Sequence, residues 1–210
     1  MNETRTPAAL TPAEQAEKDL GLERLIFFSD AVFAIVITLL ALDLRLPASE
    51  GYLDNRATWN GLIAILPKFL AYFLSFFIVG AYWLGHHRIF NLVKHFDRTL
   101  LWLNLILLSF IGLVPFATEL LSETGNSVAT LFYAAVMGLV GMTSAGIWFY
   151  ATRNSRLLDR AIEPGLWRRV MLRMLIAPTV FLLSIPLAFI DDDLAKYSWI
   201  IIAAVIFIHI

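Results

Sequence analysis

Six long runs of apolar residues dominate this chain, and each run is close to the length of one membrane crossing. A helix needs about 20 mainly apolar residues to span the roughly 30 Å hydrocarbon core of a bilayer. Transmembrane strands are about 10 residues long and alternate in polarity, whereas these runs are longer and unbroken. The pattern predicts membrane-spanning helices at residues 25–46, 60–84, 98–121, 127–150, 169–190 and 194–210.

Residues 1–23 precede the first apolar run and are polar, with more acidic than basic side chains and with Pro7 and Pro12. They lack the basic start, the apolar stretch and the small-residue cleavage site of a signal peptide. We therefore expect a cytoplasmic N-terminal leader over residues 1–23 and a six-span membrane domain over residues 24–210.

The basic residues between the runs are distributed unevenly. Twelve Lys and Arg residues fall on the side that holds the N-terminus, and Arg45, Arg56 and Lys196 fall on the other side. Because positive charge is retained in the cytoplasm, this bias predicts that both termini are cytoplasmic, as an even number of spans requires.

Composition supports an all-α integral membrane protein. The chain is 59% hydrophobic and only 16% charged, whereas a soluble domain has roughly 45–50% apolar and about 25% charged residues. A formal net charge of −1 excludes a basic nucleic-acid binder. The absence of cysteine excludes disulfides, thiolate metal sites and a cysteine nucleophile.

The first apolar run contains a carboxylate, Asp30. A charge inside the membrane costs at least about 2.5 kcal/mol and needs a partner. At about 100° per residue, four side chains share one helical face, centred about 130° from Asp30: Ile35, Thr38, Leu39 and Leu42. From these residues alone, Asp30 is either a structural polar group or an ion or proton site. The four-residue face either packs against lipid and protein or lines a path.

The start of this run reads Arg24-x-x-x-Phe28-Ser29-Asp30, and further motif residues follow in order along the chain. These are Trp83, His86, Arg88, Phe90, Asp97, Asn104, Pro115 and Phe116. In this order they resemble the transmembrane protein 175 family of potassium channels, over about residues 24–120.

The resemblance implies a potassium-permeable cation channel without the re-entrant filter of ordinary potassium channels, and the chain contains no TVGYG-like segment. A single Phe-Ser-Asp motif with six spans is similar to the prokaryotic form, a homotetramer of the inner membrane in which each first helix lines the pore. By this resemblance, Ile35 is expected to form a hydrophobic constriction, and Thr38 to contribute a weak to moderate preference for K⁺ over Na⁺. Leu39 and Leu42 are expected to line the pore further.

The other motif residues are expected to brace the pore helix, because unmatched polar groups in a low dielectric are costly. This expected network comprises Arg24, Phe28, Ser29, Asp30, Trp83, His86, Asp97 and Asn104. At the outer mouth, Asp43 is expected to cluster with Glu50 and Asp54 and to favour cations.

An enzyme and a coupled transporter are the two functional classes other than a channel that this sequence suggests. Histidines at positions 86, 87, 95 and 209 form no H-E-x-x-H motif and have few nearby carboxylates, so we expect no enzyme, no cofactor and no metal beyond permeating K⁺. A proton- or ion-coupled secondary transporter is the alternative, but the second half of the chain lacks a counterpart of the Phe-Ser-Asp motif that an internal repeat would show.

Overall fold

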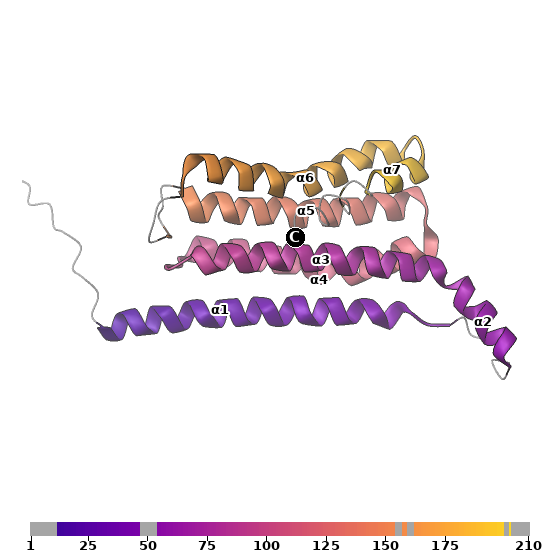
Figure 1. Ribbon diagram of the computed structural model, residues 1–210, viewed down its shortest axis with the longest axis horizontal. Helices are drawn as coiled ribbons and strands as arrows, with labels where there is room; N and C mark the ends of the chain where they lie inside the picture. The colour runs from indigo at the N-terminus through magenta and orange to yellow at the C-terminus, as the bar shows by residue number, and fades with distance from the viewer. Residues whose placement is uncertain (1–11, 47–53, 154–156, 159–161, 200–201, 203–210) are drawn as a thin grey trace, which may run out of the picture.

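The computed structural model describes residues 12–46, 54–153, 157–158, 162–199 and 202, and their regular secondary structure is helical (Figure 1). The elements are α1 (Pro12–Leu39), the 3₁₀ helix η1 (Leu40–Asp43), α2 (Asn55–Ala64), α3 (Leu66–Leu92), α4 (Arg98–Thr124), α5 (Ser127–Thr152), α6 (Pro164–Ala188) and α7 (Asp192–Ser198).

Five helical segments among these described residues are long and apolar enough to cross a bilayer: Leu20–Asp43, α3, α4, α5 and α6. The protein is therefore an integral membrane protein. The expected sixth span at 194–210 lies mostly outside the described residues, and only its beginning coincides with the short helix α7.

The first helix begins at Pro12, so residues 12–23 of the expected leader are helical and continuous with the first span. Proline is well suited to the first position of a helix, and the following Ala, Glu, Gln, Lys and Leu residues favour helix formation. Leu22 is buried, and a methyl group at Gly21 would lie 2.8 Å from Phe96 Cζ. The polar extension therefore continues the membrane helix and packs against the loop that follows α3.

The second apolar run, expected to form one span over 60–84, contains a helix break at Ile65. Asp54 caps α2 by accepting a hydrogen bond from Ala57 N at 2.6 Å. Pro67 lies in the first turn of α3, where its missing N–H costs nothing. Helix α3 then continues to Leu92, so Trp83 and His86 lie within it rather than at its end.

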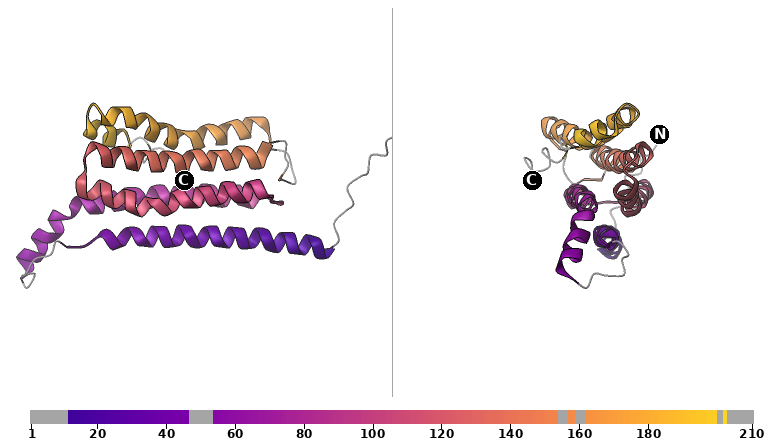
Figure 2. Two further views of the ribbon diagram at one scale, coloured as in Figure 1. Left: turned by 180° about the vertical axis from the view of Figure 1, so that it is seen from behind. Right: turned by 90° about the vertical axis from the view of Figure 1, so that its right-hand side faces the viewer.

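Helix α1 lies at one edge of the bundle, against α3 and α4 and away from α5 and α6 (Figures 1 and 2). Helices α5 and α6 approach closely through small residues, because a methyl group at Gly138 would lie 2.7 Å from Leu182 Cδ2. A methyl group at Gly141 would lie 2.7 Å from Pro178 Cβ. The bundle thus has a tightly packed side and a side on which α1 keeps one face uncovered.

Candidate functional site

The two faces of α1 differ sharply in burial. Ser29, Phe33 and Val36 are almost fully buried against α3 and α4. On the opposite face Ile35 is 57% exposed and Leu42 is 58% exposed. A long apolar side chain of a membrane helix that is more than half exposed in one chain faces lipid, another subunit or a pore.

The exposed face includes all four residues singled out from the sequence. Leu39 is 41% exposed, and Thr38 is also exposed. Thr38 Oγ1 donates a hydrogen bond to the backbone oxygen of Ile35 at 2.8 Å. Because the single hydroxyl hydrogen is used within the helix, the lone pairs of Thr38 Oγ1 remain available on the exposed face.

Three of the expected network residues form one buried chain of hydrogen bonds across α1, α4 and α3. Ser29 Oγ donates to Leu25 O at 2.9 Å and accepts from Asn104 Nδ2 at 2.9 Å. Asn104 Oδ1 lies 2.9 Å from His86 Nε2. The His86 ring also stacks on Phe90, with 4.2 Å between ring centroids. This chain ties the buried face of α1 to both neighbouring helices.

Asp30 has a different partner. The half-buried Asp30 accepts a hydrogen bond from Trp83 Nε1, with 2.8 Å between Asp30 Oδ1 and the indole nitrogen. Trp83 lies on α3 one turn before His86, so the two α3 residues hold adjacent positions of α1. The carboxylate thus points toward the protein and lies off the exposed Ile35 face.

The structure does not bring every expected residue into this network. Arg24 and Phe28 are exposed, and Arg24 makes no side-chain hydrogen bond or ion pair with the part of the chain that is described. Asp97 belongs to a separate contact, where it caps α4 through Leu100 N at 2.9 Å and accepts from Tyr150 Oη at 2.5 Å. Within a single subunit, these three residues therefore take no part in the hydrogen bonds that join Ser29, Asn104 and His86.

A second buried polar cluster was not predicted from the sequence. Ser75 Oγ lies 2.8 Å from Thr118 Oγ1 and 3.0 Å from Tyr133 Oη. These three side chains come from α3, α4 and α5 and are almost fully buried. Isolated Ser, Thr and Tyr residues in apolar runs are common, so only the helix packing reveals this cluster.

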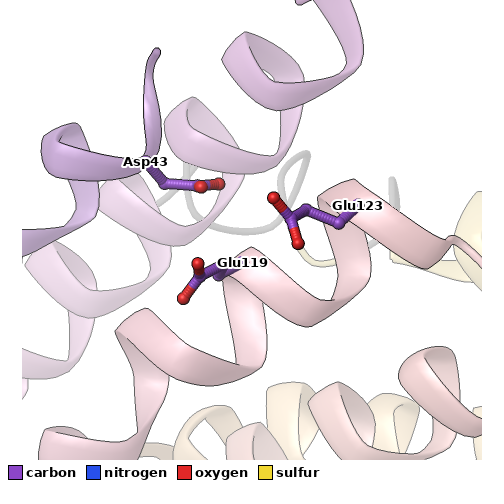
Figure 3. Close-up of side chains that lie close together, drawn as sticks. All are labelled: Asp43, Glu119 and Glu123. Atoms are coloured by element: carbon purple, nitrogen blue, oxygen red, sulfur yellow. The ribbon is translucent and has the colours of Figure 1, made fainter. Parts of the chain in front are cut away.

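At the far end of α1, Asp43 joins two carboxylates of α4, Glu119 and Glu123, and their oxygens lie within 4.8 Å of one another (Figure 3). Lys68 Nζ lies 3.3 Å from Asp43 Oδ1 and 3.1 Å from Glu123 Oε1. Ser122 Oγ donates to Asp43 Oδ2 at 3.0 Å. These residues have the donor set of a cation site, but the Lys68 ammonium already supplies positive charge there.

This cluster differs from the predicted outer mouth. Asp54 caps α2, and Glu50 lies outside the described residues. Asp43 instead borders a cleft of about 620 Å³ that also involves Leu39, Leu42 and Arg45. The exposed face of α1 therefore leads into a charged cleft at its end.

Comparison with known proteins identifies the family. A family profile described as "Endosomal/lysosomal potassium channel TMEM175" matches residues 24–115. A potassium channel of Streptomyces collinus is 34% identical over 172 residues, which cover 80% of this chain and 82% of that protein. The chain belongs to the TMEM175 family. This is a family of ion channels, not of enzymes.

TMEM175 relatives also include a solved structure and longer animal proteins. The crystal structure of a lysosomal potassium-selective channel TMEM175 homolog from Chamaesiphon minutus matches with a TM-score of 0.75 and 27% identity, covering 90% of this chain and 97% of that one. The human endosomal/lysosomal proton channel TMEM175 is 34% identical over 155 residues, 70% of this chain but 31% of that protein. The stretch matched by the TMEM175 profile contains the exposed face of α1 and the Ser29–Asn104–His86 chain.

Proposed function

We propose that this chain is one subunit of a homotetrameric channel that conducts K⁺ passively, with α1 of each subunit lining the pore. Relatives from Streptomyces collinus, Chryseobacterium and Chamaesiphon minutus are named potassium channels. The observation that carries the proposal is the uncovered apolar face of α1, whose opposite face is locked to α3 and α4.

The side chains on this face suit a gated cation path. Four Ile35 side chains around one axis offer no oxygen to a dehydrated ion and form a constriction that conducts only when it is wide enough to hold water. Thr38 lies about 4.5 Å further along the helix axis. Its unused lone pairs can replace part of the hydration shell of K⁺, which favours weak to moderate selectivity over Na⁺.

The polar residues have supporting roles in this proposal. Ser29, Asn104 and His86 fix the rotation of α1 about its axis, and the Trp83–Asp30 bond does the same beside them. At the other end, Asp43, Glu119 and Glu123 outnumber the basic Lys68 and Arg45 along the cleft. This excess of carboxylates favours cations over anions near the mouth.

We infer that the channel lies in a prokaryotic inner membrane with both ends of the chain in the cytoplasm. The uneven distribution of Lys and Arg supports this orientation. Under it, the Ser29–Asn104–His86 chain lies nearer the cytoplasmic side, and the Asp43 cluster lies at the outer mouth.

Ion flux through the purified protein in liposomes tests the function. We expect faster K⁺ than Na⁺ flux and unitary current steps in planar bilayers. Ile35→Asn should raise K⁺ flux at least threefold by wetting the constriction, whereas Leu183→Asn, at an exposed position on α6, should leave it unchanged. Saturable flux that requires a proton gradient, without unitary steps, would instead identify a coupled transporter.

The oligomeric state has a direct test of its own. Native mass spectrometry of the detergent-solubilised protein should give four times the chain mass of 23.7 kDa. A monomer or dimer that still conducts K⁺ would rule out a pore made of four α1 helices.

A further inference from the structure

A cavity of about 150 Å³ is lined by residues of α3, α5 and α6. Its walls are mostly apolar and include Ile78, Met174 and Ala177, and the exposed Arg173 also borders it. Gly85 also lines it, and a methyl group at Gly85 would meet no atom within 4 Å. An apolar protein cavity of about this volume is known to bind benzene, so the space suits one six-membered ring.

Two almost fully buried polar side chains, His86 and Ser144, line this cavity. His86 Nδ1 and Ser144 Oγ both lack a hydrogen-bond partner among the described residues. A buried polar atom without a partner costs about 1–3 kcal/mol. The cavity therefore combines an apolar interior with unmet hydrogen-bonding capacity.

The hydrogen-bond chain determines what His86 Nδ1 can accept. Ser29 Oγ uses its hydrogen on Leu25 O, so Asn104 must donate to it through Nδ2. Asn104 Oδ1 is then an acceptor, and His86 must donate to it through Nε2–H. In a neutral imidazole the other nitrogen is an acceptor. His86 Nδ1 thus presents a lone pair that requires a hydrogen-bond donor.

We propose that this cavity binds a small neutral molecule with an apolar body and one hydroxyl group, such as a phenol or a compact alcohol. The hydroxyl donates to His86 Nδ1 and accepts from Ser144 Oγ, and the apolar body fills the space beside Gly85. The site therefore selects neutral hydroxyl compounds over plain hydrocarbons of the same size, which leave Nδ1 unpaired.

Fluorine NMR titration of the purified full chain in detergent tests this site with two probes, para-fluorophenol and fluorobenzene. We expect para-fluorophenol to bind about tenfold more tightly than fluorobenzene, because fluorobenzene leaves Nδ1 unpaired. Equal affinities for para-fluorophenol and fluorobenzene would overturn the proposal.

A pair of glycine variants locates the binding. Gly85→Leu places a side chain in the cavity and should weaken para-fluorophenol binding at least tenfold. Gly146→Leu is the matched control, because a methyl group at Gly146 also meets no atom within 4 Å and Gly146 does not line the cavity. Unchanged binding to Gly85→Leu would overturn the assignment. Since these titrations measure binding and not flux, their failure leaves the proposed channel function intact.

Discussion

Asn104 is the residue whose replacement should most directly loosen α1 from the bundle. It is fully buried and joins Ser29 on α1 to His86 on α3. Asn104→Leu keeps a similar side-chain size but leaves the Nε2–H of His86 without an acceptor and removes the donor to Ser29 Oγ. An unsatisfied buried donor costs about 1–3 kcal/mol, and interhelical hydrogen bonds in membranes average about 0.6 kcal/mol. We expect a loss of about 2 kcal/mol.

The free energy of unfolding in mixed detergent and dodecyl sulfate micelles, followed by tryptophan fluorescence, measures this loss. Ser109→Ala is the control, because Ser109 lies exposed on the same helix and its hydroxyl donates to Ile106 O of its own helix, at 2.7 Å. It should change the unfolding free energy by less than about 0.5 kcal/mol.

A double-mutant cycle adds a sharper check of the same network. Ser29→Ala should cost about 1 kcal/mol alone and clearly less when Asn104→Leu is already present, because the two residues share one hydrogen bond. If Asn104→Leu proves as harmless as Ser109→Ala, or if the Ser29 and Asn104 effects simply add, the chain does not hold α1.

Three further variants and one control probe the packing and charges of the bundle. Gly138→Ala should destabilise the protein by about 1–2 kcal/mol through its clash with α6, whereas Gly146→Ala should be neutral or stabilising; thermal unfolding distinguishes them. Tyr150→Phe should cost about 1 kcal/mol in the same assay by removing the hydroxyl donor to Asp97. Lys68→Met should cost about 1 kcal/mol at low ionic strength and less at high salt, because salt screens the remaining carboxylates; a loss independent of salt would contradict this reasoning.

Hydropathy predicted the membrane helices well because burial in lipid is a property of long runs, which a sequence displays directly. The ends were harder to predict. Residues 12–23 are polar, which hides the fact that their helix-forming composition continues α1. At Ile65 the apolar run continues but the helix does not, because Pro67 cannot donate a backbone hydrogen bond.

Part of the polar network around Asp30 could also be predicted from the sequence, because a carboxylate within an apolar run is visible directly. Asp30 inside an apolar run demanded a partner, and Trp83 supplies it. Helical spacing also separated Ile35 from Asp30 correctly, since both lie on one regular helix. The neighbours of Asp43 could not be found in this way, because Lys68, Glu119 and Glu123 reach it from two other helices.

The most direct test of the pore assignment is cysteine accessibility along α1, which the natural absence of cysteine makes clean. Single variants Thr38→Cys and Leu42→Cys would be treated with a membrane-impermeant methanethiosulfonate cation during liposome K⁺ flux, with Leu183→Cys on the exposed surface of α6 as control. We predict that flux falls at least fivefold at positions 38 and 42 and is unchanged at position 183. Full flux after complete modification of positions 38 and 42 would show that this face of α1 does not line the ion path.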